Sequence, residues 1–205
     1  PDSIIGDFLS SVMSQQGMLW LSSPACTELE MRMLEWLRQA LGLPEMFAEG
    51  GRGGGVIQDT ASSAVLATLV AARERATNGQ VSECGPSATQ GLVAYCSHQA
   101  HSSMAKAVGM AGIGRANLRA IDTDKNYCLD VDAFQAQVEA DLQAGLTPFF
   151  CSATVGTTAS GAFDPVEAMS TICKAHDIWL HVDAAWAGSA AISSTHRDAI
   201  VAGAE

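Results

Sequence analysis

The stretch Leu180-His181-Val182-Asp183-Ala184-Ala185-Trp186-Ala187-Gly188 decides the fold of this chain. The apolar residues 178–180 predict a buried strand, and Asp183 stands where that strand should end. In an open α/β sheet, ligands bind in the crevice at the carboxyl ends of the strands. The small residues after Asp183 leave space beside it, which favours a flat ligand close to the backbone. An Asp at a strand end can equally cap the next turn, so this stretch alone leaves both interpretations open.

The composition indicates a globular protein with a sizeable core. Of its 205 residues, 48% are hydrophobic and 16% are charged. The net charge of −11 and the absence of a basic run argue against nucleic acid or an anionic membrane as a partner. No apolar run approaches the roughly 18 residues of a membrane-spanning helix. Residues 1–3 lack the basic start of a signal peptide, and six scattered cysteines form no CxxC pair, so we expect a reducing, cytoplasmic compartment.

Two helices are predicted in the first part of the chain. Residues 3–21 predict a helix that breaks near Gly17. The second helix is better marked, with Ser23 as N-cap, Pro24 in the first position and Gly42 at its end. Apolar residues recur along it at helical spacing, which predicts a stripe that faces the core. They are Leu29, Met33, Trp36, Leu37 and Leu41.

A glycine-rich loop, residues 50–55, fits neither common nucleotide-binding signature and is interpreted as a turn before a short strand, Val56-Ile57. The residues Asp59-Thr60-Ala61-Ser62-Ser63 then lead into a helix over 64–76. Small hydroxyl residues at a helix start that follows a strand favour an anion site, because free N–H groups and the positive helix end point at the ligand. An ordinary Ser/Thr N-cap explains the same residues more simply.

The rest of the chain alternates strands with helices. Strands are predicted at 92–96, 118–121 and 149–151, and helices that begin at 97–103, 130 and 164–165. His98 and His101 are three residues apart near one predicted helix start, but no acid or cysteine completes a metal site, so we expect no metal. The alternation predicts an α/β fold with a mostly parallel sheet flanked by helices, and no domain boundary is evident.

Five stretches, in this order and at these spacings, resemble one family. They are residues 23–30, Gly55-Val56-Ile57-Gln58 with Thr60-Ala61-Ser62, residues 99–103, Val155-Gly156-Thr157-Thr158, and residues 181–185. Together they resemble the pyridoxal-phosphate-dependent group II decarboxylases, and most of all the aromatic-L-amino-acid decarboxylases. The resemblance implies the large domain of fold-type I pyridoxal-phosphate enzymes, working as a homodimer. Because family members have several hundred residues, we expect residues 1–205 to be a partial large domain, without an N-terminal segment and a C-terminal small domain.

The resemblance also implies the roles of particular residues toward pyridoxal 5'-phosphate. Asp183 would pair with the pyridine nitrogen of the cofactor, and Ala185 would pack against one face of its ring. His101 would stack on the opposite face and approach the carboxylate of the substrate. Three residues would hold the phosphate at the helix start, and a fourth would contact the region of the ring hydroxyl. They are Thr60, Ala61 and Ser62 for the phosphate and Thr158, in preference to Thr157, for the ring.

The implied activity is decarboxylation of an L-amino acid, aromatic by resemblance, to the amine and CO₂. The family's Schiff-base lysine would fall just past Glu205, and Lys106, Lys125 and Lys174 do not occupy its position, so we expect the chain alone to be inactive. Trp186 and the stretch around Met18 depart from close relatives, which leaves the substrate side chain open. Decarboxylation of glutamate or another non-aromatic acid, and an inactive truncated homologue that packs on a partner subunit, are the alternatives. The missing glycine fingerprint excludes a nucleotide-binding oxidoreductase.

Overall fold

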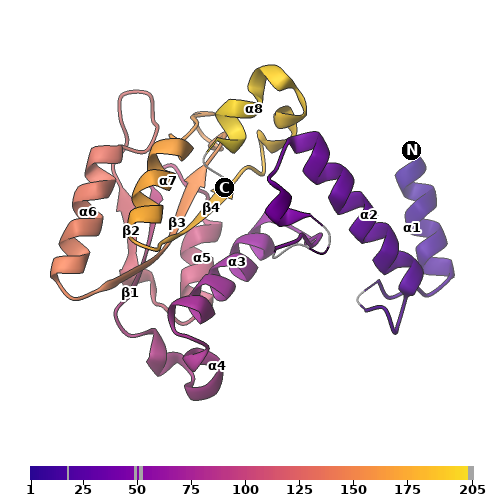
Figure 1. Ribbon diagram of the computed structural model, residues 1–205, viewed down its shortest axis with the longest axis horizontal. Helices are drawn as coiled ribbons and strands as arrows, with labels where there is room; N and C mark the ends of the chain where they lie inside the picture. The colour runs from indigo at the N-terminus through magenta and orange to yellow at the C-terminus, as the bar shows by residue number, and fades with distance from the viewer. Residues whose placement is uncertain (18, 49, 51–52, 203–205) are drawn as a thin grey trace. The chain divides into compact units, whose positions relative to one another are not determined.

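The computed structural model describes residues 1–17, 19–48, 50 and 53–202. Contacts divide the chain into two compact units, Pro1–Ile57 and Gln58–Glu205. The first unit holds the helices α1 and α2, and the second holds a sheet and the remaining helices (Figure 1). Within the described residues, no helix combines the length and apolar character needed to cross a membrane.

In the first unit, the signals at the start and end of the second helix are confirmed. Helix α2 (Pro24–Leu41) has Pro24 in its first turn, and Gly42 ends it in the left-handed conformation with φ of 72°. Ser23 occupies the N-cap position, but its hydroxyl donates to Oε1 of Gln15 at 2.6 Å instead of capping the helix. The first helix is shorter than predicted, because α1 (Asp2–Val12) ends well before Gly17. A 3-10 turn, η1 (Glu45–Phe47), follows α2.

The predicted core stripe of α2 is wrong for this chain, because four of its five apolar side chains are exposed and Leu41 is only partly buried. Leu29 is 60% and Trp36 57% exposed, and α1 has no buried residue. Helical spacing of apolar residues shows which face requires cover but not what covers it. The predicted strand Val56-Ile57 is also wrong. Both residues are exposed outside any strand, and the N–H of Ile57 donates to a carboxylate oxygen of Glu30 at 2.9 Å.

The second unit contains a parallel sheet, as predicted. Its strands are β1 (Leu92–Ser97), β2 (Leu118–Ile121), β3 (Thr147–Thr154) and β4 (Trp179–Asp183). Their order across the sheet is β2-β1-β3-β4, and all pairs are parallel. Strand β2 matches its predicted bounds, whereas β3 is longer than the three-residue apolar core that marked it.

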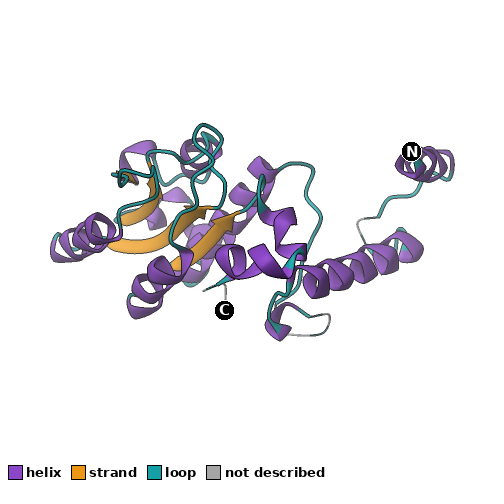
Figure 2. Ribbon diagram, turned by 90° about the horizontal axis from the view of Figure 1, so that it is seen from above, coloured by secondary structure: helices purple, strands orange, loops and turns teal. Residues whose placement is uncertain are grey.

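Helices cover both faces of this sheet (Figures 1 and 2). Helices α3 (Ala61–Ala76) and α5 (Ser103–Met110) lie on one face, and α6 (Val131–Gln143) and α7 (Val166–Ala175) lie on the other. Right-handed crossovers require this division, because the chain moves one way across the sheet from β1 to β2 and the opposite way afterwards. The sequence prediction lacked the short elements. They are α4 (Gln80–Cys84), α8 (Ser194–Val201), η2 (Pro86–Thr89), η3 (Arg115–Asn117) and η4 (Gly188–Ile192).

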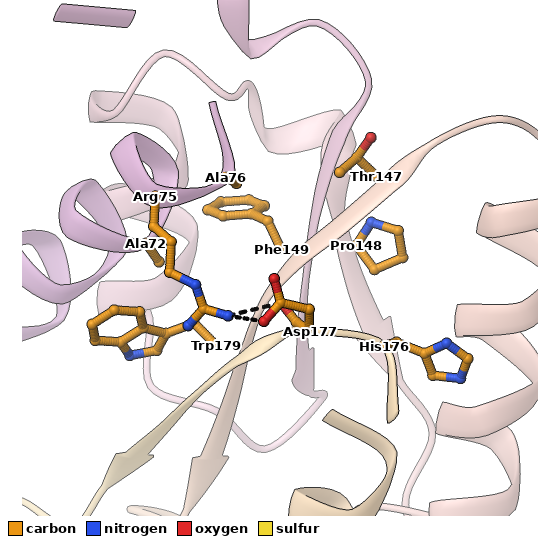
Figure 3. A pocket seen from close by; sticks show the side chains of 9 residues that line it. All are labelled: Ala72, Arg75, Ala76, Thr147, Pro148, Phe149, His176, Asp177 and Trp179. Carbon is orange, nitrogen blue, oxygen red and sulfur yellow. Dashed lines mark hydrogen bonds and ion pairs between the residues drawn. The ribbon is translucent and has the colours of Figure 1, made fainter. Parts of the chain in front are cut away.

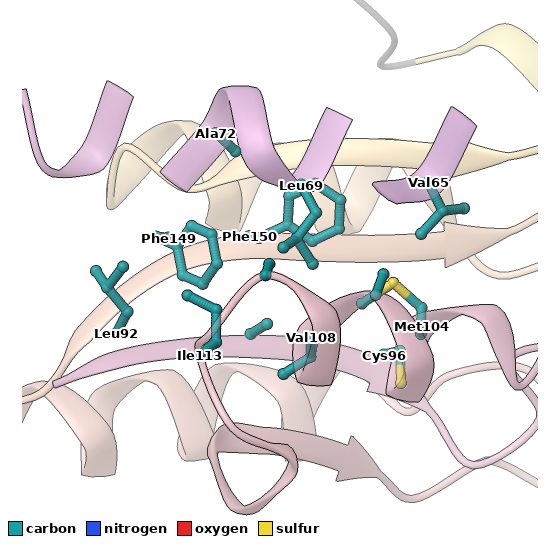
Figure 4. Close-up of a cluster of buried hydrophobic side chains, with 13 residues drawn as sticks. Val65, Leu69, Ala72, Leu92, Cys96, Met104, Val108, Ile113, Phe149 and Phe150 are labelled. Carbon is teal, nitrogen blue, oxygen red and sulfur yellow. The ribbon is translucent and has the colours of Figure 1, made fainter. Parts of the chain in front are cut away.

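The face covered by α3 and α5 holds the apolar core. Leu69 of α3, Val108 of α5 and Phe150 of β3 are completely buried and belong to one cluster (Figure 4). Cys96 and Cys151 are buried free thiols in their strands, where a reduced thiol packs as a small hydrophobic group. This packing fixes α3 lengthwise against the sheet, and that placement positions the site described below.

The opposite face carries a buried polar network. The hydroxyl of Tyr95 on β1 donates to Asp141 on α6 at 2.9 Å, and Arg119 on β2 donates to both oxygens of the same carboxylate. Burial raises the pKa of Asp141, but the hydrogen bonds from Arg119 and Tyr95 outweigh it and hold the pKa below its usual value. The network ties α6 to two strands.

Candidate functional site

The carboxyl edge of the sheet brings together the ends of three strands. Because the strands are parallel, Ser97 of β1, Thr154 of β3 and Asp183 of β4 end at the same edge. Ligands of open α/β sheets bind outside such an edge. The opening prediction from the sequence is therefore confirmed in one respect: Asp183 is the last residue of its strand.

Helix α3 runs antiparallel to β4, so its start lies toward the same edge. In the middle of the contact, Thr68 Oγ1 lies 3.4 Å from Nδ1 of His181. At the far end, Arg75 pairs with Asp177, which comes shortly before β4 begins. Ala61, the first residue of α3, is therefore on the side of Asp183.

Asp183 has a neighbourhood of small residues. One carboxylate oxygen accepts a hydrogen bond of 3.3 Å from the N–H of Ala185, and its carbonyl accepts from Val155 N–H at 2.9 Å. Ala185 is exposed beside it. The bond to Ala185 is a turn contact, so the capping role is real. It is also a long bond to one oxygen, and it leaves the carboxylate at the edge of the sheet.

Polar side chains continue from Asp183 along the face that α3 covers. The register pairs Ser152 with His181 and Thr154 with Asp183, so these four side chains share one face. The hydroxyl oxygens of Ser152 and Thr154 are buried, and neither has a hydrogen-bond partner among the described residues. Buried hydroxyls are normally paired, so these two are available to a group that the described residues do not supply. The sequence analysis did not predict Ser152 or Thr154 as site residues. Their spacing of two residues, which equals that of His181 and Asp183, could have indicated that they share a face of the sheet.

His181 is a buried histidine next to this carboxylate. Its ring stacks on Phe150, with centroids 5.8 Å apart and planes at 23°. Burial lowers the pKa of His181, and the charge of Asp183 raises it, with burial the larger effect. The imidazole is therefore neutral at pH 7, and it places no positive charge beside Asp183.

Helix α3 begins at Ala61, three residues before the predicted start at residue 64, and Thr60 is its N-cap. Oγ1 of Thr60 accepts from the N–H of Ser63 at 3.2 Å, and the hydroxyl of Ser63 accepts from the N–H of Thr60 at 3.2 Å. Ala61 and Ser62 are exposed in the first turn. The hydroxyl of Ser63 also donates to Asp59 and lowers the pKa of that carboxyl, so a negative charge stands beside the helix start.

The loop after β3 distinguishes its two neighbouring threonines. Thr157 is buried, and its hydroxyl bonds Ser160 at 2.7 Å and accepts from Ala162 N–H at 3.0 Å. Thr158 is exposed. Gly156 precedes them with φ of +87°, and a Cβ built there would lie 2.4 Å from Cε3 of Trp186, so glycine is required both by conformation and by space.

His101 lies before a helix and not within it. Helix α5 begins at Ser103, so the predicted helix start over residues 97–103 is too early, and His98 and His101 do not share a helix face. Nδ1 of His101 accepts from the N–H of Ser103 at 3.3 Å, which places the proton of the neutral ring on Nε2. Nε2 of His98 instead lies 3.5 Å from Oδ1 of Asp122. In the part of the chain that is described, no three His, Cys, Asp or Glu side chains cluster as metal ligands.

The sequence analysis predicted Asp164 as the N-cap of the helix observed as α7, and that prediction is wrong. The N-cap position is Pro165, one residue later. The buried carboxylate of Asp164 accepts instead from the N–H groups of Leu129 and Thr154, each at 2.8 Å. It thereby fixes the last residue of β3 beside Asp183. Burial raises the pKa of this carboxyl against the opposing effect of the two hydrogen bonds.

Comparison with known proteins gives one consistent result. Residues 2–205 match the family described as the pyridoxal-dependent decarboxylase conserved domain. The chain is 46% identical over 198 residues to phenylacetaldehyde synthase of Arabidopsis thaliana, covering 96% of this chain and 40% of that protein. It is 45% identical over 202 residues to aromatic-L-amino-acid decarboxylase of Manduca sexta, covering 95% of this chain and 39% of the relative. The chain thus spans about two fifths of the length of these relatives.

Solved structures agree with the sequence relatives. Tryptophan decarboxylase of Catharanthus roseus, in complex with L-tryptophan, superposes with a TM-score of 0.90 at 42% identity, over 98% of this chain and 43% of that one. The Oryza sativa enzyme with PLP and tryptamine gives a TM-score of 0.90 at 43% identity, over 98% of this chain and 41% of that one. The fold predicted from the sequence is confirmed. Met18, in a stretch expected to shape the substrate pocket, lies outside the described residues.

Proposed function

The chain belongs to the pyridoxal-dependent decarboxylase family, and on this premise we propose that its protein decarboxylates an aromatic L-amino acid to the amine and CO₂ with pyridoxal 5'-phosphate. The observation that carries the proposal is the carboxylate of Asp183 at the end of β4, beside the buried, unpartnered hydroxyl of Thr154. The aromatic substrate class is supported by relatives named tryptophan, tyrosine and aromatic-L-amino-acid decarboxylases.

The residues at the sheet edge fit the cofactor. When bound, pyridoxal phosphate supplies an electron sink for the carbanion that loss of CO₂ leaves. Asp183 holds the proton on the pyridine nitrogen, since a carboxylate beside a cationic N–H favours the charged form of both. Ala185 leaves a flat space next to that carboxylate, which a larger side chain would fill. His101, whose Nδ1 accepts from Ser103 N–H, would lie on the other side of the ring, with its Nε2–H available to the carboxylate of the substrate.

The start of α3 and the loop after β3 complete this proposed site. The exposed first turn at Ala61 and Ser62 offers N–H groups and a hydroxyl to the phosphate. Thr60 contributes through the cap that orders this turn. The exposed hydroxyl of Thr158 would contact the region of the ring hydroxyl, in preference to Thr157, whose hydroxyl is engaged within the loop.

A homodimer in a reducing, cytoplasmic setting is part of the same proposal. Two helices present apolar side chains to solvent: α1 exposes Phe8 at 65% and Ile4 at 64%, and α2 exposes Leu29 and Trp36. A second copy of the protein would bury these faces. The described cysteines are all free, which suits a reducing compartment. Residues 1–205 would then be part of a larger cofactor-binding domain, as the length of the relatives suggests.

The decisive experiment supplies pyridoxal phosphate to the purified full-length protein, of which residues 1–205 are part in this proposal, and offers L-tryptophan, L-tyrosine, L-phenylalanine and L-glutamate in parallel. CO₂ release and the organic product are measured by mass spectrometry. Amine from an aromatic substrate supports the proposal. Turnover of glutamate alone would move the protein to the non-aromatic alternative, and an aldehyde product would match the phenylacetaldehyde synthase relative. Cofactor binding without turnover of any amino acid would leave the inactive homologue.

A further inference from the structure

The loop that follows β3 is a self-bonded unit at the carboxyl edge of the sheet, and it carries Thr158. An antiparallel bridge between Val155 and Phe163 closes its base. Within the loop, the carbonyl of Ala162 accepts from the N–H of Thr157 at 3.0 Å, and the N–H of Ala162 donates to the hydroxyl of Thr157 at 3.0 Å. These bonds fix the shape of the loop. Its position relative to the end of β4 depends on its contacts with the turn that follows β4.

Trp186, in the turn after β4, packs on this loop at Gly156. A Cβ built on Gly156 would clash with Cε3 of Trp186, and it would lie 3.2 Å from Cζ3 of the same ring and 3.0 Å from Cβ of Ala187. The edge of the indole ring therefore touches the glycine backbone directly. The N–H of Gly188 donates to the carbonyl of Ala184 at 2.8 Å and closes the turn that holds the tryptophan. The indole thus joins the turn after β4 to the loop after β3.

Gly156 makes this contact important for the position of the loop. Its φ is +87°, and a glycine has more backbone conformations available to it than any other residue. Gly156 is also the first residue after the bridge that closes the base of the loop. The ring of Trp186 covers one side of this junction. Without the ring, the loop can turn about Gly156 and carry Thr158 away from Asp183.

The tryptophans at the two ends of β4 differ in what covers them. Trp179, the first residue of the strand, packs against the apolar core, and Cζ of Arg75 lies 5.7 Å from its ring centroid (Figure 3). Trp186, beyond the other end, is 71% exposed. A side chain that leaves most of its surface in water contributes little to folding by burial. We therefore expect Trp179 to stabilise the fold and Trp186 to act on the loop that it touches.

We infer that Trp186 is a positioning residue, which holds the loop of residues 156–162 beside Asp183 so that the hydroxyl of Thr158 reaches the ring of the cofactor. This role rests on the proposed function, in which Asp183 and Thr158 both face pyridoxal phosphate. Trp186 acts through the loop and not by touching the cofactor. The ring atoms that meet Gly156 are carbon atoms, so another flat aromatic ring can make the same contact.

The test measures the affinity of the cofactor-free, full-length protein for pyridoxamine 5'-phosphate, whose amine cannot form an imine with a lysine side chain. The affinity therefore reports the contacts of the phosphate and the ring. Trp186→Ala should weaken binding by about threefold to tenfold, whereas Trp186→Phe, which keeps a flat ring on Gly156, should bind within about twofold of the wild type. The midpoint of thermal unfolding should change by less than about 2 °C in both variants.

A double variant shows whether Trp186 acts through Thr158. Thr158→Val removes the hydroxyl and should weaken binding by about threefold to tenfold by itself. Adding Trp186→Ala to it should weaken binding by less than about twofold more, because the group that Trp186 positions is already gone. Trp179→Leu is the matched control at the other end of β4. It should lower the midpoint of thermal unfolding by about 4 °C and leave the affinity unchanged.

Three results would overturn the positioning role in a protein whose wild type binds pyridoxamine phosphate. They are wild-type affinity in Trp186→Ala, equal losses of affinity in Trp186→Ala and Trp186→Phe, and losses that multiply in full when Trp186→Ala is combined with Thr158→Val. A wild-type protein that does not bind pyridoxamine phosphate at all would overturn the proposed function, and the role of Trp186 with it.

Discussion

Helix α3 and strand β4 pack along their lengths, and the two ends of this contact are built differently. At the amino end of β4, Arg75 and Asp177 pair with each other, and the guanidinium also covers Trp179. At the carboxyl end, Asp183 lies beside Thr154, whose buried hydroxyl has no partner in the described residues. The first end satisfies its own charges, whereas the second has polar groups whose partners the described protein does not supply. That difference supports the proposal that the cofactor binds at the carboxyl end.

The largest expected effect comes from removing the carboxylate at that end. In the full-length protein loaded with pyridoxal phosphate, Asp183→Ala should lower turnover by at least about a hundredfold, because the pyridine nitrogen would lose its counter-charge. The midpoint of thermal unfolding should change little, since the side chain makes one long bond, to Ala185. Turnover and thermal unfolding are measured on the same preparation. Near-normal turnover would remove Asp183 from the proposed site and make it a turn residue only.

His181, in the middle of the contact, should make stability depend on pH. Its folded-state pKa is lowered from 6.5, so below about pH 6.5 the unfolded state binds the extra proton more readily and stability falls as the pH drops. The contribution is fully present above that pH. In His181→Leu this loss between about pH 6.5 and 5 should disappear, as measured by urea unfolding at a series of pH values. Thr68 keeps its bonds to the carbonyls of Ala64 and Val65 in that variant.

The matched control for this pH series is His98→Gln, which changes an exposed imidazole. Its stability should follow the wild-type curve. An unchanged curve for His181→Leu would mean that the buried imidazole does not contribute to the pH dependence, and the contact between α3 and β4 would then be uniform in this respect.

The existence of the strands was predictable, because local signals carry it, whereas the ends of β3 lie beyond the predicted residues 149–151. Apolar runs marked all four strands, and Asp183 stood where β4 ends. The polar groups around Asp183 were not predictable in the same way. Ser152 and Thr154 join it only through the register of β3 and β4, which pairs Thr154 with a residue far along the chain. Likewise, Arg75 and Asp177 are 102 residues apart, so no local pattern could reveal their ion pair.

The errors of the sequence prediction have related causes. The apolar stripe of α2 was real, but amphipathic spacing does not specify the surface that covers it, and Trp36 is exposed. Asp164 carries the Asp-Pro signal of a helix start, yet its carboxylate bonds two backbone N–H groups from other segments. A tertiary contact thus displaced a local cap, and α7 begins one position later than predicted.

A smaller effect is expected at Thr154. It tests whether the buried hydroxyl lowers the free energy of unfolding when no cofactor is bound. Thr154→Val keeps the shape and removes a group without a partner, so the free energy of unfolding without cofactor should stay equal or rise by up to about 1 kcal/mol. Affinity for pyridoxal phosphate, measured by fluorescence, should fall by about twofold to tenfold if the cofactor supplies that partner.

Thr89 is the matched control, because it is equally buried, at 5% exposed, but its hydroxyl donates to the carbonyls of Pro86 and Gly112. Thr89→Val should lose about 1 kcal/mol of stability and leave cofactor affinity unchanged. Equal losses of stability in the two variants would show that the hydroxyl of Thr154 has a partner in the folded protein. Thr154 would then not distinguish the carboxyl end of the contact from the amino end.

The smallest effect is expected at the amino end, where the charges already satisfy each other. Arg75→Met should lower the free energy of unfolding by less than about 1 kcal/mol, because the pair with Asp177 is exposed and the methionine keeps much of the apolar contact with Trp179. Urea unfolding at low and high salt measures this difference, and salt should shrink it further because exposed charges are screened. A loss several times larger, insensitive to salt, would mean that Arg75 supports the fold. The two ends of the contact would then both be structural.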